Sequence, residues 1–256
     1  MMLFVLMLLV NVVYGVDYRK PALLSSSAYC NPDEILNWSC RPCKGISDIR
    51  VDSFYEIGAD VELYTAYDYE VNWVVFRGSD SIEDWLMNVD IELEPANWEC
   101  EFSIHGGFKR VWEESYTDIQ YVLSKVNRSR PIFFAGHSLG GVLATLTAYN
   151  LSYIDSPIYT FGMPRIGDNA FTDCFSSYEL YRFVNERDIF AHLPPLFMDY
   201  RHPPREYWWI EDELNDCSPI DGEDMACSDS FPGGISIDDH RFFSNIEFKC
   251  VGEIGI

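Results

Sequence analysis

A serine between two glycines is the first candidate for chemistry in this chain. Residues 136 to 140 read Gly-His-Ser-Leu-Gly, which matches the pattern G-x-S-x-G with Ser138 at its centre. An apolar run precedes this pattern and a second apolar stretch follows it. In that context the pattern predicts a sharp strand-to-helix turn that exposes the serine hydroxyl beside unpaired N–H groups of a helix N-terminus. The chemistry would be nucleophilic attack on an acyl carbonyl; the alternative is an ordinary turn.

A serine nucleophile needs a base that takes its proton and an acid that orients the base. Of the five histidines, His240 is our candidate for the base, because it lies downstream of every predicted strand. We expect the others to be a packing residue beside the nucleophile, two residues in structural turns and one residue just after the acid: His137, His105, His202 and His192. The acid should follow a strand between the serine and the histidine, as Asp188 does. Asp199 and the acids at 211–239 are rivals, but we expect their segment to be irregular and solvated.

The elements that must position these residues alternate between strands and helices. Short apolar runs bounded by glycine or proline predict buried parallel strands at 131–136 and 156–162, with a helix between them at 138–151. Residues 59–78 predict a hairpin, residues 180–188 a further strand that runs into a polar loop, and residues 205–210 an additional strand. Helical spacing also predicts an amphipathic helix at 108–126, with an apolar face of Phe108, Val111, Trp112, Ile119, Val122, Leu123 and Val126. Together these elements predict an α/β domain.

The N-terminal residues have the pattern of a secretory signal peptide. The first sixteen residues carry no charged side chain, are apolar for most of their length, and end in small or aliphatic residues around Gly15. We therefore divide the chain into a signal peptide at 1–15 and a single domain at 16–256, and we expect a secreted, extracellular protein. An uncleaved anchor is the alternative, because no basic residue precedes the apolar run. That run is short against the ~20 residues of a membrane span.

Eight cysteines, an even number, fit a chain that enters an oxidising compartment, so disulfides are the expected state. Cys40 and Cys43 form a CxxC, but no second CxxC or His/Cys pair accompanies it, which disfavours a zinc site. Spacing alone leaves about 105 connectivities open. Three N-x-[ST] sequons are candidate glycosylation sites and agree with secretion: Asn37, Asn127 and Asn150.

The formal net charge of −23 is spread along the chain and is not gathered in a tail. It argues against nucleic-acid binding, which needs basic patches, and against attraction to strongly anionic membranes. Neutral or zwitterionic partners fit better. Residues 211–229 carry the heaviest acid load. One hypothesis is that their negative field helps to expel anionic products.

Seven segments together resemble the class 3 lipase family, the group of filamentous-fungal triacylglycerol lipases. They stand in the family's order and approximate spacing over nearly all of the mature sequence: VVFRGSDSIEDWLMNVD, HGGFKRVW, AGHSLGGVLATL, YTFGMPRIGD, RFVNERDIFAHLPP, REYWWI and DDHRFF. The resemblance implies an α/β-hydrolase-type fold with a central, mostly parallel sheet, helices on both faces and a short helical lid. It also implies a catalytic triad of Ser138, Asp188 and His240, and an oxyanion hole formed by Ser79 and the amide of Leu139.

The same resemblance implies how the cysteines pair. It joins Cys30 with Cys250, Cys40 with Cys43, and Cys217 with Cys227, which leaves Cys100 and Cys174 to each other by elimination.

Residues 81–91, SIEDWLMNVDI, stand where the family has its lid. Their apolar residues follow i, i+3, i+4, i+7 spacing: Ile82, Trp85, Leu86 and Val89. A lid would turn this face outward on a lipid surface. The alternative is a surface helix that stays packed on the core, and helical spacing does not separate the two.

The sequence thus predicts a secreted lipase for triacylglycerol or other neutral acylglycerols, which acts through a serine acyl-enzyme and needs no metal or organic cofactor. A phospholipase A1 or a feruloyl-type esterase for aromatic acyl groups is the alternative within the enzyme class, because one fold serves several substrates. A catalytically silent, secreted binding protein on the same scaffold is the alternative from another class. We expect a monomer that contacts ester lipid transiently at a lipid–water interface, without a membrane span and without nucleic acid.

Overall fold

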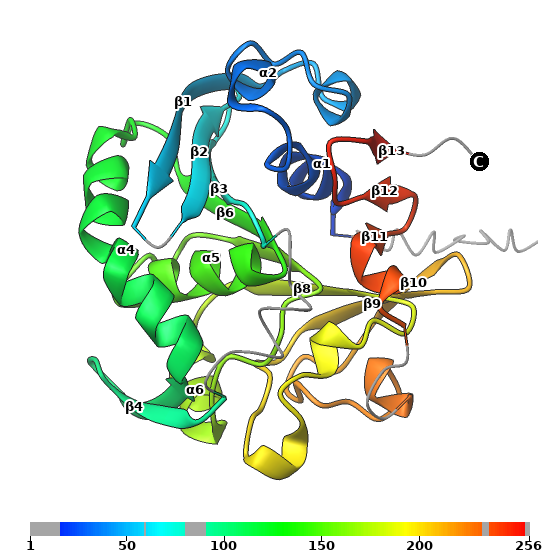
Figure 1. Ribbon diagram of the computed structural model, residues 1–256. Helices are drawn as coiled ribbons and strands as arrows, with labels where there is room; N and C mark the ends of the chain where they lie inside the picture. The colour runs from blue at the N-terminus through cyan, green and yellow to red at the C-terminus, as the bar shows by residue number, and fades with distance from the viewer. Residues whose placement is uncertain (1–15, 59, 80–90, 232–235, 254–256) are drawn as a thin grey trace, which may run out of the picture.

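A computed structural model of the chain describes residues 16–58, 60–79, 91–231 and 236–253 (Figure 1). Its centre is an eight-stranded sheet. The strands lie in the order β1 (Arg50–Ile57), β2 (Val61–Tyr67), β3 (Asn72–Phe76), β6 (Ile132–His137), β7 (Ile158–Phe161), β8 (Leu180–Asn185), β9 (Glu206–Ile210) and β10 (Glu213–Asp216). The run from β3 to β9 is parallel, whereas β1, β2 and β10 join antiparallel at the two edges. The predicted central, mostly parallel sheet is confirmed.

Helices cover both faces of this sheet, as Figure 1 shows. The helix α1 (Arg19–Ser27) packs on one face, and α4 (Gly106–Lys125) and α5 (Leu139–Asn150) pack on the other. The strands divide the core by alternation, because successive side chains point to opposite faces. In β2, for example, Leu63 belongs to the cluster under α4 and α5, whereas its neighbour Tyr64 belongs to the cluster under α1.

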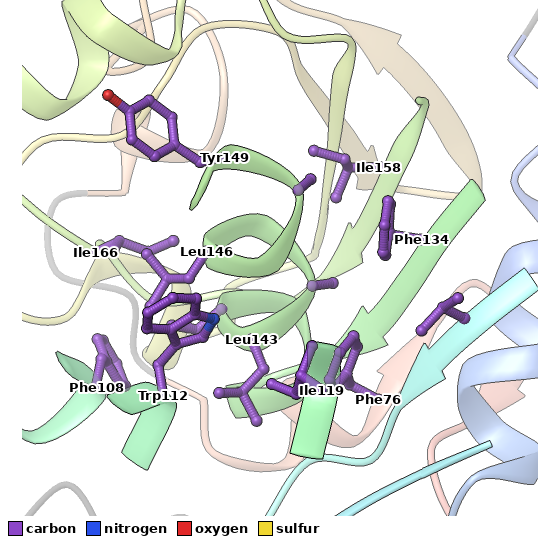
Figure 2. Close-up of a cluster of buried hydrophobic side chains, with 14 of the residues drawn as sticks. Phe76, Phe108, Trp112, Ile119, Phe134, Leu143, Leu146, Tyr149, Ile158 and Ile166 are labelled. Carbon is purple, nitrogen blue, oxygen red and sulfur yellow. The ribbon is translucent and has the colours of Figure 1, made fainter. Parts of the chain in front are cut away.

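The predicted helix at 108–126 corresponds to α4, and its apolar face is buried apart from Val111, which is half-buried. Figure 2 shows this side of the core, in which Trp112 of α4, Leu143 of α5 and Phe134 of β6 belong to one hydrophobic cluster. Phe108 and Phe134 have no exposed surface. Burying a side chain of this size contributes about 1.5–3 kcal/mol.

The remaining elements are short. They are α2 (Pro32–Leu36), α6 (Asn169–Phe175), the 3₁₀ helices η1 (Pro42–Gly45), η2 (Phe190–His192), η3 (Leu196–Met198), η4 (Ser228–Ser230) and η5 (Asp238–Arg241), a ribbon of β4 (Leu93–Asn97) and β5 (Glu101–His105), and a small sheet of β11 (Phe242–Phe243), β12 (Ile246–Glu247) and β13 (Gly252–Glu253). Figure 1 shows this small C-terminal sheet beside α1.

Four disulfides join distant and local parts of the chain. The pairs are Cys30–Cys250, Cys40–Cys43, Cys100–Cys174 and Cys217–Cys227. The first ties the segment after α1 to the small C-terminal sheet across 220 residues. These are the pairs that the family resemblance implied, including the one that was assigned by elimination.

The structure bears differently on the predicted glycosylation sites, the predicted signal peptide and the expected lack of a membrane span. Asn37 and Asn127 are exposed and Asn150 is half-buried. The predicted signal peptide at 1–15 lies outside the described residues. Within the described parts of the chain, no helix is both long enough and apolar enough to cross a membrane.

Candidate active site

Ser138 stands at the turn between β6 and α5 with a strained backbone. Its φ is 57° and its ψ is −126°, a conformation that non-glycine residues rarely adopt outside functional sites. Glycines on either side make the turn possible. A Cβ at Gly136 would lie 2.3 Å from the carbonyl of Gly140, and a Cβ at Gly140 would lie 2.3 Å from the carbonyl oxygen of Phe76. The sharp strand-to-helix turn predicted from the G-x-S-x-G pattern is therefore observed.

Asp188 and His240 form a buried hydrogen-bonded pair. His240 Nδ1 lies 3.0 and 2.9 Å from the two carboxylate oxygens of Asp188. The exposed fraction is 2% for His240 and 1% for Asp188. A carboxylate only accepts, so Nδ1 carries a proton, and in the neutral ring Nε2 is then the acceptor. His240 Nε2 and Ser138 Oγ are both buried, and neither makes a hydrogen bond within the described residues.

Two loops from different parts of the chain bring this pair together. The Asp188 loop follows β8, and a short parallel bridge joins Asp188 to Ser236, just before η5 and its His240. Asn185, the last residue of β8, also connects the Asp188 loop to the segment around His240. Its Nδ2 donates to the carbonyl of Asp239 at 3.1 Å, and its Oδ1 accepts from the amide of Ser244 at 3.1 Å. The acid and the base are thus held by one network.

Gly162 is a site residue that the sequence analysis missed. It follows β7 with a φ of +56°, and a Cβ at this position would lie 2.7 Å from Asp188 Oδ2 and 2.8 Å from His240 Nδ1. Any side chain at residue 162 would therefore displace the hydrogen-bonded pair. The available signal was a glycine directly after an apolar strand, at the same edge of the sheet as Ser138.

The two residues predicted to form the oxyanion hole, Ser79 and Leu139, both belong to segments next to Ser138. Leu139 is the first residue of α5, so its amide is one of the N–H groups that a helix leaves unpaired at its start. Gly78 passes directly beside the serine, because a Cβ there would lie 3.3 Å from Ser138 Cβ. Ser79 is the next residue and is half-buried. The predicted lid residues Ile82, Trp85, Leu86 and Val89 lie outside the described residues.

Three of the four other histidines, His105, His192 and His202, are buried and hydrogen-bonded to backbone groups. The expectation of a turn at His105 is wrong, because His105 ends β5 and caps α4 by accepting the amide of Gly107 at 3.1 Å. His192 Nδ1 lies 2.8 Å from the carbonyl of Asp188, and His202 Nε2 lies 2.7 Å from that of Ala191. Hydrogen bonds of this kind fix side chains in the core.

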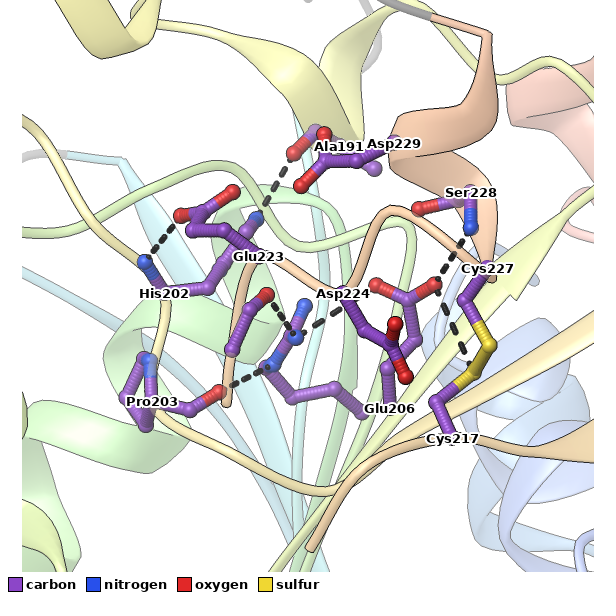
Figure 3. Close-up of polar contacts among 12 residues, drawn as sticks. Ala191, His202, Pro203, Glu206, Cys217, Glu223, Asp224, Cys227, Ser228 and Asp229 are labelled. Carbon is purple, nitrogen blue, oxygen red and sulfur yellow. Dashed lines mark hydrogen bonds and ion pairs between the residues drawn. A yellow bond between two sulfur atoms is a disulfide. The ribbon is translucent and has the colours of Figure 1, made fainter. Parts of the chain in front are cut away.

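Part of the acidic segment at 211–229 is buried, so the expectation of a solvated segment is wrong for these residues. Arg165 makes a two-pronged contact with Glu223 at 2.9 and 2.6 Å and lies 3.3 Å from Asp229. Arg165 also donates to the carbonyls of His192 and Pro194 in the loop that follows Asp188. Glu223 also accepts a hydrogen bond from the backbone amide of His202 at 2.6 Å, a contact drawn in Figure 3. The segment thus braces the acid loop from outside.

Burial and neighbouring charges shift the pKa values of the two acids in opposite directions. Burial and the adjacent Glu223 together raise the pKa of Asp229 to about 7. The pKa of Glu223 is lowered to about 2, because the hydrogen bond and charge of Arg165 together with His202 outweigh the effect of its burial. Arg165 thus faces one carboxyl group that is ionised at neutral pH, Glu223, and one that titrates near neutral pH, Asp229.

Two groups of cysteine and glutamate atoms lie close enough to hold a metal ion in the described parts of the chain: Cys30, Glu34 and Cys250, and Glu206, Cys217 and Cys227. All four cysteines are in disulfides, and a metal-binding cysteine must be a free thiolate. Neither group therefore fits a metal site.

Comparison with known proteins identifies the class of this fold and site. The profile of the family Lipase (class 3) matches residues 73–198. The lipase of Rhizomucor miehei is 30% identical over 258 residues, covering 87% of this chain and 66% of that protein. The secreted mono- and diacylglycerol lipase 1 of Fusarium solani is 30% identical over 200 residues, covering 72% and 60%.

Solved structures give the same result. The Rhizomucor miehei triacylglyceride lipase has a TM-score of 0.78 and 28% identity, with 90% of this chain and 94% of that one covered. A triacylglycerol lipase whose catalytic centre is described as a serine protease triad has a TM-score of 0.79 at 28% identity, with 91% and 96% covered. The fold is an α/β-hydrolase fold. The chain belongs to the class 3 lipase family, and it spans 60–66% of the length of the curated relatives named above.

Proposed function

We propose that this protein is a secreted serine hydrolase that cleaves carboxylic esters, with neutral acylglycerols as its substrates. The observation that carries the proposal is a buried Asp188–His240 pair whose acid follows β8 at the same edge of the sheet where Ser138 stands in a strained strand-to-helix turn after β6. The relatives that support it are a lipase and a secreted mono- and diacylglycerol lipase. The four disulfides support secretion, because they persist in oxidising compartments.

The proposed mechanism is acyl transfer to water in two halves. In the first, Ser138 Oγ attacks the ester carbonyl carbon while His240 Nε2 takes the hydroxyl proton, and Asp188 stabilises the resulting imidazolium. The amide of Leu139 and Ser79 hold the oxyanion. When the carbonyl re-forms, the ester C–O bond breaks and the alcohol leaves with the proton from His240.

Water carries out the second half. His240 takes a proton from water as the water oxygen attacks the acyl-enzyme carbonyl, the bond to Ser138 Oγ breaks, and the proton returns to the serine. The products are a carboxylic acid and the regenerated enzyme. Every proton in the cycle passes through His240, so no metal or organic cofactor is part of the chemistry.

Charge favours neutral over anionic substrates. A chain with a net charge of −23 is repelled by surfaces rich in anionic lipid.

Ser138 has no exposed surface and His240 is 2% exposed. A lipid ester therefore needs a rearrangement that opens the site before its carbonyl can reach the serine. We expect this opening to respond to a lipid surface.

The test is hydrolysis by the purified protein and its Ser138→Ala variant, with a short-chain soluble ester and a long-chain triacylglycerol measured through its solubility limit. We expect Ser138→Ala to lose nearly all turnover of both substrates while its thermal melting stays cooperative. A rate that rises once the triacylglycerol forms an interface supports a lipase, whereas saturation on the soluble ester alone supports an esterase. Turnover that survives in Ser138→Ala contradicts the proposed nucleophile.

Ser152→Ala is a matched control for this variant. Ser152 has a φ of 56°, close to the 57° of Ser138, but it is exposed and lies beyond the far end of α5. The change also removes a sequon, so both variants should be compared with the parent after enzymatic removal of N-linked glycans. We expect Ser152→Ala to hydrolyse both substrates at the parent rate.

A further inference from the structure

The imidazole of His137, next to the proposed nucleophile, connects two distant parts of the chain. Its Nδ1 lies 2.7 Å from the hydroxyl of Tyr29, and its Nε2 lies 2.7 Å from the backbone carbonyl oxygen of His240. Its ring also stacks on Phe248 at 4.1 Å with an interplanar angle of 14°. His137 is 5% exposed. Its position beside the nucleophile predicts a packing residue, but both of its nitrogens have polar partners.

The partners determine where the proton of this ring lies. A backbone carbonyl oxygen only accepts hydrogen bonds, so His137 Nε2 must carry the hydrogen that it donates to His240. In a neutral ring Nδ1 is then an acceptor, and the Tyr29 hydroxyl donates to it. Burial holds the pKa of His137 well below its usual range, and the charge of His240 lowers it further. The ring is therefore neutral, and it adds no positive charge against the imidazolium that forms on His240.

His240 is restrained from several directions. Its Nδ1 is bound by Asp188, and its ring packs against Phe190 at 4.3 Å and against His137 at 4.6 Å between ring centroids. The hydrogen bond from His137 holds the backbone of the same residue. Asp188 alone leaves the imidazole free to swing with its main chain. Fixing that main chain determines where Nε2 lies relative to Ser138.

Tyr29 reaches this site through a gap that a glycine leaves open. A Cβ at Gly78 would lie 2.3 Å from the Tyr29 hydroxyl and 2.6 Å from the carbonyl oxygen of His137. The residue after Tyr29 is Cys30, which is joined to Cys250 by a disulfide. The tyrosine is therefore anchored by the cross-link that ties the segment after α1 to the small C-terminal sheet, and its hydroxyl lies beside the serine turn.

We propose that Tyr29 and His137 are positioning residues, which hold the backbone of His240 so that its Nε2 faces Ser138 during proton transfer. Neither residue touches the ester. This inference rests on the proposed function, since positioning matters only if His240 is the base. Its signature is a loss in kcat with little change in KM, because the alignment of the base is used in the chemical steps and not in substrate binding.

Tyr29→Phe is the direct test, because it removes one hydroxyl and leaves the ring. With a soluble short-chain ester we expect kcat to fall about 3- to 10-fold, the range for one net hydrogen bond, with KM unchanged within twofold. Tyr64→Phe is the matched control. The buried Tyr64 hydroxyl lies 2.9 Å from the carbonyl of Leu24 and 2.8 Å from Ser27 Oγ, both on α1. Its loss should lower the melting temperature and leave kcat unchanged.

His137 provides a second test with a conservative variant. In His137→Gln the side-chain amide can still donate to the His240 carbonyl, whereas His137→Leu has no donor. We expect His137→Gln to retain several-fold more kcat than His137→Leu at equal KM. Equal kcat in the two variants, or equal loss in Tyr29→Phe and Tyr64→Phe, would show a merely structural role and overturn the inference.

The parent enzyme separates this inference from the proposed function. A phosphonate ester that reacts with active-site serines should label the parent at Ser138, and the labelling rate should fall in Tyr29→Phe in parallel with kcat. No labelling and no turnover in the parent would refute the proposed function itself. Labelling and turnover at parent rates in Tyr29→Phe would refute only the positioning role.

Discussion

At the scale of single residues, the site depends on four glycines as much as on its reactive groups. A Cβ at Gly78, Gly136, Gly140 or Gly162 would lie 2.3, 2.3, 2.3 or 2.7 Å, respectively, from an atom of a neighbouring segment. Real side chains do not approach this closely without a shift of the backbone. The four positions surround the serine turn and the Asp188–His240 pair. The absence of a side chain therefore sets the spacing of the proposed catalytic groups.

Gly162→Ala tests this idea at the residue that contacts the acid and the base. The new methyl group would meet both Asp188 and His240, and a φ of +56° disfavours alanine. We expect kcat for a soluble ester to fall about 100-fold, as for a misplacement of about 1 Å in a catalytic group. Steady-state kinetics and a melting curve for the same preparation measure the two effects.

Gly58→Ala is the control for backbone strain. Gly58 has a φ of +47°, and its Cβ would lie 2.4 Å from Ser115 Oγ, in a turn between β1 and β2 that is remote from the site. We expect it to lower the melting temperature and keep the parent kcat. A Gly162→Ala protein that hydrolyses ester at the parent rate would show that the pair tolerates the methyl group.

The residues predicted from the sequence are those with a local signature. Ser138 has its pattern, and Asp188 and His240 have their order in the chain, so each could be proposed without the fold. Tyr29 could not, because it lies 108 residues from His137 and no local pattern connects them. A partner of this kind becomes visible only when the chain folds.

At the scale of elements, parallel strands explain why the proposed acid and nucleophile meet. Ser138 follows β6 and Asp188 follows β8, and parallel strands end at the same edge of a sheet. The central strands were predicted from apolar runs, and β3 is buried at every position. The edge strands β1 and β10 were not predicted. Neither has a buried residue, so neither produces an apolar run.

The buried part of the acidic segment leads to a pH prediction at the same scale. The pKa of Asp229 is raised to about 7 in the folded protein, from an unfolded value near 3.8. The folded state therefore binds this proton more tightly, and its contribution to stability is fully present below about pH 4 and lost as the pH rises through 7. Glu223 acts oppositely, because its pKa is lowered to about 2 and its contribution is lost below its ordinary value of 4.5.

Asp229→Asn isolates the first of these effects. The amide keeps an oxygen for Arg165 and does not titrate, so the loss of stability between pH 5 and 8 should be smaller in the variant. The slopes of parent and variant should differ by at most about 1.4 kcal/mol per pH unit, the value for one proton. Urea unfolding at several pH values measures both slopes. Parallel curves would mean that Asp229 is ionised throughout this range.

The control is Glu213→Gln, because Glu213 is exposed in β10 and we expect no change in the slope of stability against pH.

At the scale of the whole molecule, charge and cross-links act on different properties. The net charge of −23 bears on which surfaces the protein approaches, whereas the fold itself comes from two apolar clusters on either side of the sheet. The cross-links restrict the unfolded chain. Cys30–Cys250 encloses most of the protein between residues 220 positions apart, while Cys40–Cys43 spans only three.

Removal of these two disulfides should therefore have different consequences. In the chain-entropy account, opening the long loop costs about 5 kcal/mol and opening the short one about 2 kcal/mol. We expect the Cys30→Ala, Cys250→Ala double variant to melt well below the Cys40→Ala, Cys43→Ala variant in the same buffer. Only the first should also lose kcat on a soluble ester, because Cys30 follows Tyr29 and its cross-link anchors the residue that binds His137. Equal losses of stability would show that local packing outweighs loop length. A stable first variant with parent kcat would show that Tyr29 keeps its place without the disulfide.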